Sequence, residues 1–227
     1  SLEQRAPYAE QFSVQAEIAR RGQAPKNFSD KPYDGALAYA YHLDAGKLAT
    51  YLKAHSKARG VCHKVQKVIQ IDRDFEDISA LHLDNGQRIE ADLFVDCTGF
   101  AARLINSDQQ NNFNSLSDTL FVDRAIVTRV PNDSLADVIG YTKSTAQSAG
   151  WIWDIALQDR RGVGDVYSSR YIDDDAAKAE LAAYVQQPVD MLEARRLDMR
   201  IGYHDQQWRG NSVAIGLSSG FLEPLES

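Results

Sequence analysis

The stretch Ala91-Asp92-Leu93-Phe94-Val95-Asp96-Cys97-Thr98-Gly99-Phe100 is the part of the sequence that decides the fold class. Its nearly continuous apolar run predicts a strand that is covered on both faces, as in a parallel sheet. Gly99 predicts a sharp turn at the end of this strand, and ligands bind beyond the carboxyl ends of strands in doubly wound sheets. The pattern fits a buried strand with an ordinary glycine turn equally well, so the segment alone leaves both interpretations open. Cys97 is expected to be a small buried thiol and not a nucleophile.

The residues before this strand predict two helices and a hairpin. Residues 8–21 have apolar positions near helical spacing, Gly22 follows them, and residues 23–35 are expected to form a loop. Residues 38–43 predict a short strand, and Asp44 is expected to cap a helix that ends at Gly60. From residue 61 the apolar period changes to two, and Asp84-Asn85-Gly86 predicts a hairpin turn because Asn-Gly tolerates positive φ angles. The next strand is expected over residues 89–97.

The second half of the chain is rich in predicted strands. An amphipathic helix is expected over residues 176–185, after the acidic residues 173–175. Strands are expected over residues 120–130, 149–157, 163–171, 194–203 and 212–217. This order of elements predicts an α/β fold with an inserted, mostly antiparallel substrate layer.

Composition narrows the class of function. The chain has 227 residues, a formal net charge of -7, 44% hydrophobic residues and 25% charged residues, which is ordinary for a globular domain. The acidic balance argues against nucleic-acid binding, and no apolar run approaches the roughly 20 residues of a membrane helix. Two cysteines and five scattered histidines lack metal-ligand spacing, so no metal site is predicted.

Two further segments have residues that could act on a ligand. Residues 212–224 predict an apolar strand followed by small residues, whose backbone amides could face an anion or a flavin edge, although composition alone favours an ordinary turn. Trp151 and Trp153 lie two apart on a predicted strand and share one face. They either wall an aromatic pocket or fill the core, which is the commoner outcome. Gly162-Val163-Gly164 is not a dinucleotide fingerprint, and no GxGxxG occurs in the sequence.

Several segments, taken in their order along the chain, resemble the flavin-dependent tryptophan halogenase family. The Trp-x-Trp-x-Ile element at 151–155 and the ending Phe-Leu-Glu-Pro-Leu-Glu-Ser at 221–227 are the most specific of them. The matching segments are Tyr39–Ala45, Ala91–Phe100, Val130–Asp133, Ser148–Ile155, Val166–Arg170 and Ile215–Ser227. Together they span about residues 39–227, which is most of the chain.

The resemblance implies a fold and a reaction. The expected fold is an FAD-binding flavoprotein-monooxygenase-like module, with residues of about 36–110 and 205–227 on the FAD side and about 115–204 in the substrate-side sheet. The expected cofactor is reduced FAD, which a separate flavin reductase supplies. With oxygen and a halide ion it would generate an oxidant that halogenates an electron-rich aromatic substrate such as tryptophan or another indole. The cytoplasm is the expected compartment, with no membrane or nucleic-acid partner.

The resemblance also assigns roles to individual residues. Glu226 matches the catalytic glutamate of the family, and Ser227 matches the serine beside it. A carboxylate can offset the positive charge of a ring intermediate, most effectively where water is excluded. Trp151 and Trp153 are expected on the side of the substrate and the oxidant. The residues expected to contact the cofactor are Val68, Thr98, Gly99, Gly216 and Leu217.

The sequence departs from the family pattern in ways that predict an incomplete enzyme. The glycine-rich FAD fingerprint and the catalytic lysine have no counterpart here, and the halide-binding Thr-Gly pair is expected beyond Ser227. Ala156 stands where the family has proline. We therefore expect an internal piece of a halogenase that is inactive alone. The alternatives are an FAD-dependent aromatic monooxygenase and a degenerate flavin-binding domain without activity. Trp151, Trp153 and the Glu226-Ser227 ending favour halogenation over the monooxygenase, whereas a full-length protein without the lysine would favour the degenerate domain.

Overall fold

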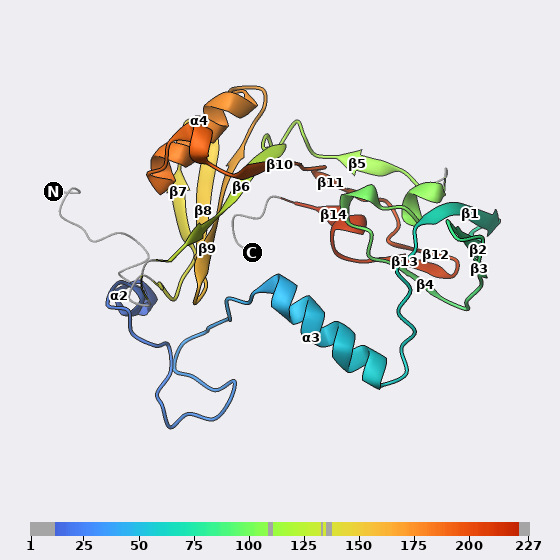
Figure 1. Cartoon of the computed structure of the whole chain (residues 1–227), viewed down its shortest axis with the longest axis horizontal. Helices are drawn as coiled ribbons and strands as arrows, with labels where there is room; N and C mark the ends of the chain where they lie inside the picture. Colours follow the sequence, from blue (N-terminus) through green and yellow to red (C-terminus); the bar gives the residue numbers. More distant parts are fainter. Residues whose placement is uncertain (1–11, 109–110, 133, 135–137, 223–227) are drawn as a thin grey trace. The chain divides into compact units, whose positions relative to one another are not determined.

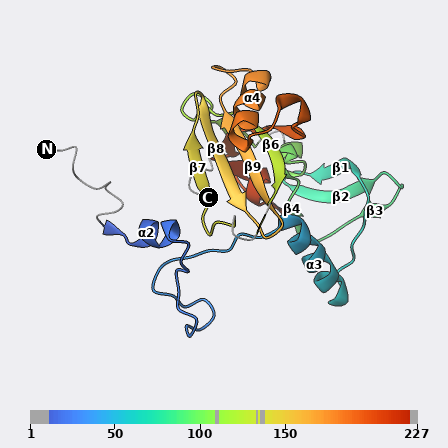
Figure 2. The same cartoon turned by 60° about the vertical axis from the view of Figure 1, so that its left-hand side comes forward.

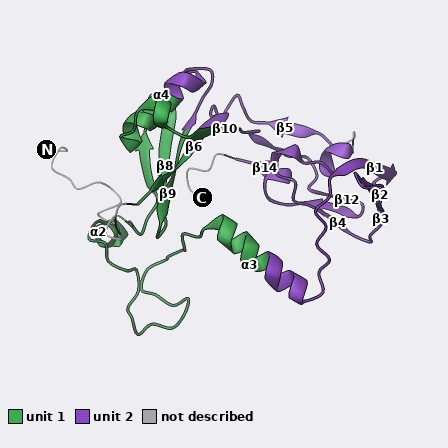
Figure 3. Ribbon diagram, in the orientation of Figure 1, with its two compact units in different colours: residues 1–52, 126–165, 178–195 green, residues 53–125, 166–177, 196–227 purple. Residues whose placement is uncertain are grey.

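The computed structural model describes residues 12–108, 111–132, 134 and 138–222. The chain divides into two compact units, each made of segments that lie far apart in the sequence (Figure 3). The first unit contains residues 1–52, 126–165 and 178–195, and the second contains residues 53–125, 166–177 and 196–227. No helix in the described part of the chain is long and apolar enough to cross a membrane.

A five-stranded sheet with the order β10-β6-β9-β8-β7 dominates the first unit, and the ends of three of its strands belong to the second (Figure 1). Its strands are β6 (Arg124–Pro131), β7 (Lys143–Ala146), β8 (Gly150–Ala156), β9 (Arg160–Tyr167) and β10 (Ala194–Asp198). Helix α4 (Asp174–Val185) lies along one face of the sheet (Figure 2). The core between them includes Ile152, Val163 and Leu181, each 0% exposed, so the predicted strands and helix of this region are confirmed.

Strand β8 presents different side chains to the two faces of this sheet. Ile152 and Asp154 are buried on the side of α4, where the Asp154 carboxylate accepts a hydrogen bond from the Tyr184 hydroxyl at 3.1 Å. Because side chains alternate along a strand, Trp151 and Trp153 lie on the opposite face. The shared face that the sequence predicts for the two tryptophans is confirmed.

The first segment of the chain contains two helices. Helix α2 (Gln15–Arg20) is shorter than predicted, with Gly22 at a φ of 61° just after it, and residues 8–11 of the prediction lie outside the described residues. Helix α3 (Ala45–Ala58) begins as predicted, because the Asp44 carboxylate accepts hydrogen bonds from the N–H groups of Gly46 and Lys47. It ends as predicted at Gly60, whose φ of 90° is a value that glycine adopts more readily than other residues.

The strand predicted over residues 38–43 is wrong. These residues have no regular secondary structure, and their contacts with the rest of the first unit include side-chain hydrogen bonds. The Gln15 side-chain amide donates to the Ala38 carbonyl at 2.8 Å, and His42 Nδ1 lies 3.2 Å from the Ala156 carbonyl oxygen. Alternation of residue size predicts extended backbone, but a strand also needs a neighbour to pair with.

Three small sheets form the second unit, with the orders β1-β2-β3, β14-β11-β5 and β12-β13-β4. The first contains β1 (Val68–Asp74), β2 (Asp77–Leu83) and β3 (Arg88–Ile89). The others contain β4 (Phe94–Asp96), β5 (Phe113–Ser115), β11 (Gly202–His204), β12 (Trp208–Arg209), β13 (Ser212–Ala214) and β14 (Gly220–Phe221). The hairpin turn predicted at Asp84-Asn85-Gly86 is confirmed, with Gly86 at a φ of 81°.

The strand predicted over residues 89–97 is divided into β3 and β4, and only one face of β4 is covered within the described chain. Phe94 and Asp96 point into the core, whereas Leu93 and Val95 are 48% and 47% exposed. The expectation of a strand covered on both faces is therefore wrong for these residues. Cys97 is exposed and not buried, because it follows the inward-facing Asp96 on the outer side of the strand. The strand predicted over residues 194–203 is likewise divided, into β10 and β11.

Candidate functional site

The two turns that the sequence predicts to contact a cofactor lie side by side in the second unit. Strands β4 and β13 are parallel, with Phe94 opposite Ser212 and Asp96 opposite Ala214. The Ile215 N–H continues the pairing by donating to the Asp96 carbonyl at 3.1 Å. The 3-10 helices η2 (Gly99–Ala101) and η6 (Gly216–Ser218) follow these strands and contact each other. Two adjacent turns at the carboxyl ends of parallel strands form the usual place for a ligand in an α/β sheet.

The buried carboxylate of Asp96 shapes the first of these turns. Its Oδ1 accepts hydrogen bonds from the Thr98 N–H at 2.9 Å and the Thr98 hydroxyl at 2.7 Å. Its Oδ2 accepts from the N–H groups of Leu104 at 2.7 Å and Ile105 at 3.0 Å. Burial alone would raise the pKa of Asp96, but the hydrogen bonds from Ile105, Thr98 and Leu104 outweigh it and hold the pKa below its usual value.

Asp96 belongs to the candidate site, although the sequence did not predict a role for it. Thr98 follows it by two positions, and an Asp side chain often bonds the backbone two residues on, so a local signal existed. The bonds to Leu104 and Ile105 have no such signal, because they cross a turn of irregular structure.

Both glycines of the paired turns leave open space beside the backbone. Gly99 and Gly216 have φ angles of 67° and 60°, and a Cβ built on either would meet no described atom within 4 Å. Leu217 is 42% exposed. An open backbone edge of this kind fits the edge of a flat cofactor such as a flavin. The sequence holds no glycine-rich loop for the pyrophosphate of a dinucleotide, so the residues present fit one part of FAD.

The other predicted site residues are not brought to these turns by the described structure. Val68 is the first residue of β1, where it pairs with Leu83 in the hairpin sheet. Glu226 and Ser227 lie outside the described residues. Trp151 and Trp153 belong to the first unit. The roles assigned to these residues therefore stay predictions.

Trp153 forms part of a cavity of about 520 Å³ on the sheet of the first unit. Val127, Arg129, Gly162, Glu193 and Arg195 also line it. Trp151 is 9% exposed and does not line the cavity. Trp153 therefore lines a pocket, as one interpretation of the pair predicts. Trp151 is buried, as the other interpretation predicts.

The Gly162-Val163-Gly164 segment explains how the Trp153 ring lies against the sheet. A Cβ built on Gly164 would approach Cε2 of Trp153 to 2.5 Å, whereas one on Gly162 would lie 3.4 Å from the ring. Only glycine at position 164 leaves room for the indole. The Gly162-Val163-Gly164 segment therefore has a packing role, in which Gly164 makes room for the ring of Trp153.

Replacing Gly164 by alanine is expected to lower the free energy of unfolding of the full-length protein by about 1–3 kcal/mol, because the new methyl group overpacks the ring of Trp153. Urea unfolding followed by circular dichroism measures the change. Gly162→Ala is the matched control and should cost less, since its Cβ would make ordinary contact. Equal costs for the two variants would contradict the packing argument.

Two acidic side chains, the buried Asp165 on β9 and the half-buried Glu180 on α4, lie near each other. Asp165 is 0% exposed, and neither of its carboxylate oxygens has a hydrogen-bond partner in the described structure. Burial and the nearby charge of Glu180 raise the pKa of Asp165 to about 7. Glu180 accepts a hydrogen bond from the Ser148 hydroxyl through one oxygen, and its other oxygen has no partner. The protonated form of Asp165 is therefore the one that the fold prefers.

This preference makes the stability of the protein depend on pH. The folded state binds a proton at Asp165 more tightly than the unfolded state does, so the stabilisation is complete below the ordinary pKa of 3.8 and is lost as pH rises through about 7. We expect the loss to amount to roughly 3 kcal/mol between pH 4 and pH 8. Asp165→Asn should flatten this slope in urea unfolding, whereas Asp190→Asn, at an exposed acid of the same unit, should leave it unchanged. A slope that survives Asp165→Asn would refute the assignment.

The described residues include no group of three or more His, Cys, Asp or Glu side chains placed to hold a metal ion. The candidate features are therefore the paired turns of the second unit and, separately, the Trp153 cavity of the first unit.

Comparison with known proteins gives a consistent result. The tryptophan halogenase family model matches residues 2–227. The chain is 42% identical over 218 residues to tryptophan 6-halogenase SttH of Streptomyces toxytricini, covering 94% of this chain and 42% of that protein. It is 37% identical over 206 residues to tryptophan 7-halogenase RebH of Lentzea aerocolonigenes, covering 88% and 39%.

Solved structures agree with the sequence comparisons. A tryptophan halogenase from Shewanella frigidimarina superimposes with a TM-score of 0.89 at 38% identity, covering 99% of this chain and 44% of that one. A flavin-dependent halogenase from Xanthomonas campestris gives a TM-score of 0.85 at 37% identity, covering 97% and 44%. The mixed α/β fold with several antiparallel sheets is therefore similar to that of flavin-dependent halogenases. The chain spans about two fifths of the length of the curated relatives that it matches.

Proposed function

Because the chain belongs to the tryptophan halogenase family, we propose that it is part of a flavin-dependent enzyme that halogenates an electron-rich aromatic substrate such as tryptophan or another indole. The observation that carries the proposal is the pairing of the Thr98-Gly99 and Gly216-Leu217 turns on neighbouring parallel strands. The second turn leads along the chain directly into the Phe-Leu-Glu-Pro-Leu-Glu-Ser ending. The proposal includes a Rossmann-type FAD module of which this chain supplies part, and the cytoplasm as the compartment.

Bound FAD, reduced by a separate flavin reductase, would supply two of the four electrons that reduce oxygen, and the halide ion would lose the other two and become an electrophilic halogen. The residues of this chain would position and separate the reactants. Thr98, Gly99, Gly216 and Leu217 would contact the flavin through open backbone edges, and Val68 would lie toward the adenine end. Trp153, which lines the cavity, would limit access on the side of the aromatic substrate, and Trp151 would support the same face of β8.

Glu226 would act at the ring that is halogenated. Electrophilic substitution places positive charge on the ring before a proton leaves, and a carboxylate can offset that charge and accept the proton. Ser227 would help to orient the carboxylate or the oxidant. The proposal gives the turn residues a binding role and Glu226 a catalytic role.

The experiment uses the full-length protein that carries this chain. It is incubated with FAD, a flavin reductase, oxygen and chloride or bromide, with tryptophan and free indole as substrates, and products are identified by mass spectrometry. A product in which one halogen replaces one hydrogen is expected. A hydroxylated product would favour the monooxygenase alternative, and bound FAD without any product would favour a degenerate flavin-binding domain. The relatives described above are halogenases, which favours the first outcome.

A further inference from the structure

His204 is a buried histidine with no hydrogen-bond partner on either ring nitrogen. It is the last residue of β11 and is 1% exposed, and neither Nδ1 nor Nε2 has a partner in the described structure. Buried polar groups are nearly always hydrogen-bonded, since leaving one unpaired costs free energy. The imidazole therefore needs a partner beyond the side chains around it.

Ser218 shares this property and precedes a residue, Ser219, that is hydrogen-bonded to the backbone of His204. Its hydroxyl is buried without a partner, and Ser218 is 1% exposed at the end of η6. The His204 N–H donates to the carbonyl of the following residue, Ser219, at 3.1 Å. The backbone of His204 is thus bonded to the residue that follows Ser218, at the turn that contains the open edge of Gly216 and Leu217.

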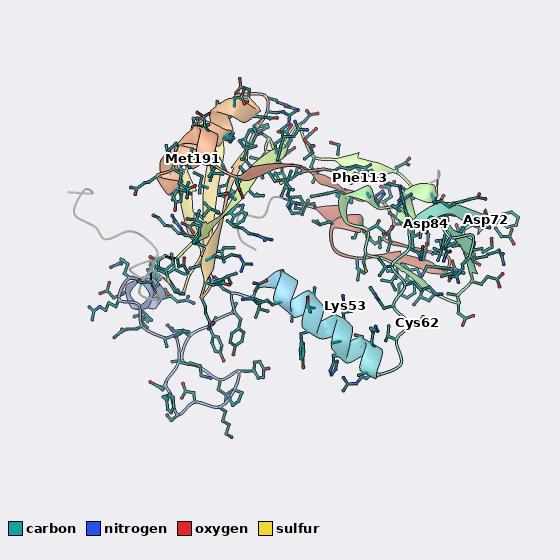
Figure 4. All side chains as sticks on the ribbon, in the orientation of Figure 1. Lys53, Cys62, Asp72, Asp84, Phe113 and Met191 are labelled. Carbon is teal, nitrogen blue, oxygen red and sulfur yellow. The ribbon has the colours of Figure 1, made fainter. Side chains whose placement is uncertain are left out.

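The surroundings of His204 favour its uncharged form. The ring of Phe113, labelled in Figure 4, packs edge-on against the imidazole at 5.2 Å between centroids, and the guanidinium of Arg200 lies 3.6 Å from the centre of the Phe113 ring. Burial and then the charge of Arg200 lower the pKa of His204 below its usual value, and the carboxylates of Asp96 and Asp205 offset this only in part. A neutral imidazole keeps one donor and one acceptor, and a hydroxyl supplies both as well.

We propose that neutral His204 and Ser218 form a buried hydrogen-bonding pair, bridged by one water molecule, that positions the Gly216-Leu217 turn for the flavin. One water can make two to four hydrogen bonds to buried polar groups that otherwise lack partners, so it can serve both side chains. The inference rests on the proposed function, because the turn is useful only if a flavin binds there. His204 is a positioning residue in this scheme and touches neither the flavin nor the substrate.

The test measures the dissociation constant of FAD by flavin fluorescence in the full-length protein between pH 5 and pH 8. His204→Phe keeps a planar ring but removes both nitrogens, and we expect it to weaken FAD binding by about tenfold at neutral pH, which corresponds to losing one net hydrogen bond. His204→Gln keeps a neutral donor and acceptor and should restore most of the affinity. His63→Gln is the control at an exposed histidine of the same unit.

The pH dependence of FAD affinity distinguishes a positioning role of His204 from a role in packing alone. Because the pKa of His204 in the folded protein lies below its usual value of 6.5, wild-type affinity should stay constant from pH 8 to about pH 6.5 and fall only at lower pH, where the imidazole gains a proton, while His204→Gln should show no such fall. Wild-type affinity in His204→Phe, or a pH dependence that persists in His204→Gln, overturns the inference while the proposed function stands. A wild-type protein that binds no FAD overturns the proposed function instead. Thermal unfolding of each variant confirms that affinity is compared between folded proteins.

Discussion

Replacing Glu226 by glutamine in the full-length enzyme is expected to reduce halogenation by roughly 10²–10³-fold, the usual cost of removing one electrostatic group that stabilises a transition state. Glutamine keeps the shape of the side chain but carries no negative charge, so it can neither offset a cationic ring nor accept its proton at neutral pH. The rate at which oxygen reoxidises the reduced flavin should change little, because that step does not involve the aromatic ring. Single-turnover measurements of flavin absorbance and of halogenated product separate the two rates.

Glu223 provides the matched control for this experiment. It is a second carboxylate in the same ending, three positions before Glu226. Glu223→Gln removes the same charge from the same segment, and it should reduce halogenation far less than Glu226→Gln. Equal loss of flavin reoxidation and halogenation in Glu226→Gln would point to a structural role for this residue and against a catalytic one.

Much of the site could be predicted from the sequence because its signals are local. An apolar run that ends in Thr98-Gly99, and another that ends in Gly216-Leu217, each predict a strand followed by a turn. The parallel pairing of β4 and β13 then joins the two turns, as expected for neighbouring strands of an α/β sheet. The helix cap at Asp44 and the hairpin at Asn85-Gly86 have the same local character.

The features that the sequence did not predict depend on contacts between distant residues. Residues 38–43 alternate like a strand, yet no strand among the described residues pairs with them, so alternation alone is not sufficient. Gly164 is explained only by the ring of Trp153 on the adjacent strand. The raised pKa of Asp165 comes first from its burial and then from the charge of Glu180, on a helix that follows it along the chain. None of these contacts has a fixed spacing that periodicity could detect.

Asp96→Ala is expected to be the most damaging single change for the fold of the second unit. The substitution would leave the N–H groups of Thr98, Leu104 and Ile105 without their acceptor. An unsatisfied buried donor costs about 1–3 kcal/mol, so the expected loss in the free energy of unfolding is roughly 3–6 kcal/mol. Natural domains are stable by only about 5–15 kcal/mol, so this loss would bring the protein close to unfolding. Urea unfolding of the full-length protein measures it.

Asp96→Asn removes the negative charge of this side chain but keeps its shape, so it shows which of the two the Thr98-Gly99 turn requires. The amide oxygen can still accept from Thr98, but its NH₂ group would face the N–H groups of Leu104 and Ile105, donor against donor. We expect an intermediate loss of stability and weaker FAD binding, because the Thr98-Gly99 turn is no longer fixed. Asp92→Asn, at an exposed acid of the same segment, is the control and should have no measurable effect.

The pH dependence of this variant gives a further check on the same argument. The pKa of Asp96 is held below its usual value in the folded protein, so its contribution is complete above the ordinary pKa of 3.8 and is lost as pH falls through the lower folded value. The difference in stability between wild type and Asp96→Asn should therefore shrink in acid. A difference that stays constant from pH 7 to pH 3 would mean that the ionised carboxylate is not what holds the turn. In that case the packing of Leu104 and Ile105 would have to position the Thr98-Gly99 backbone instead.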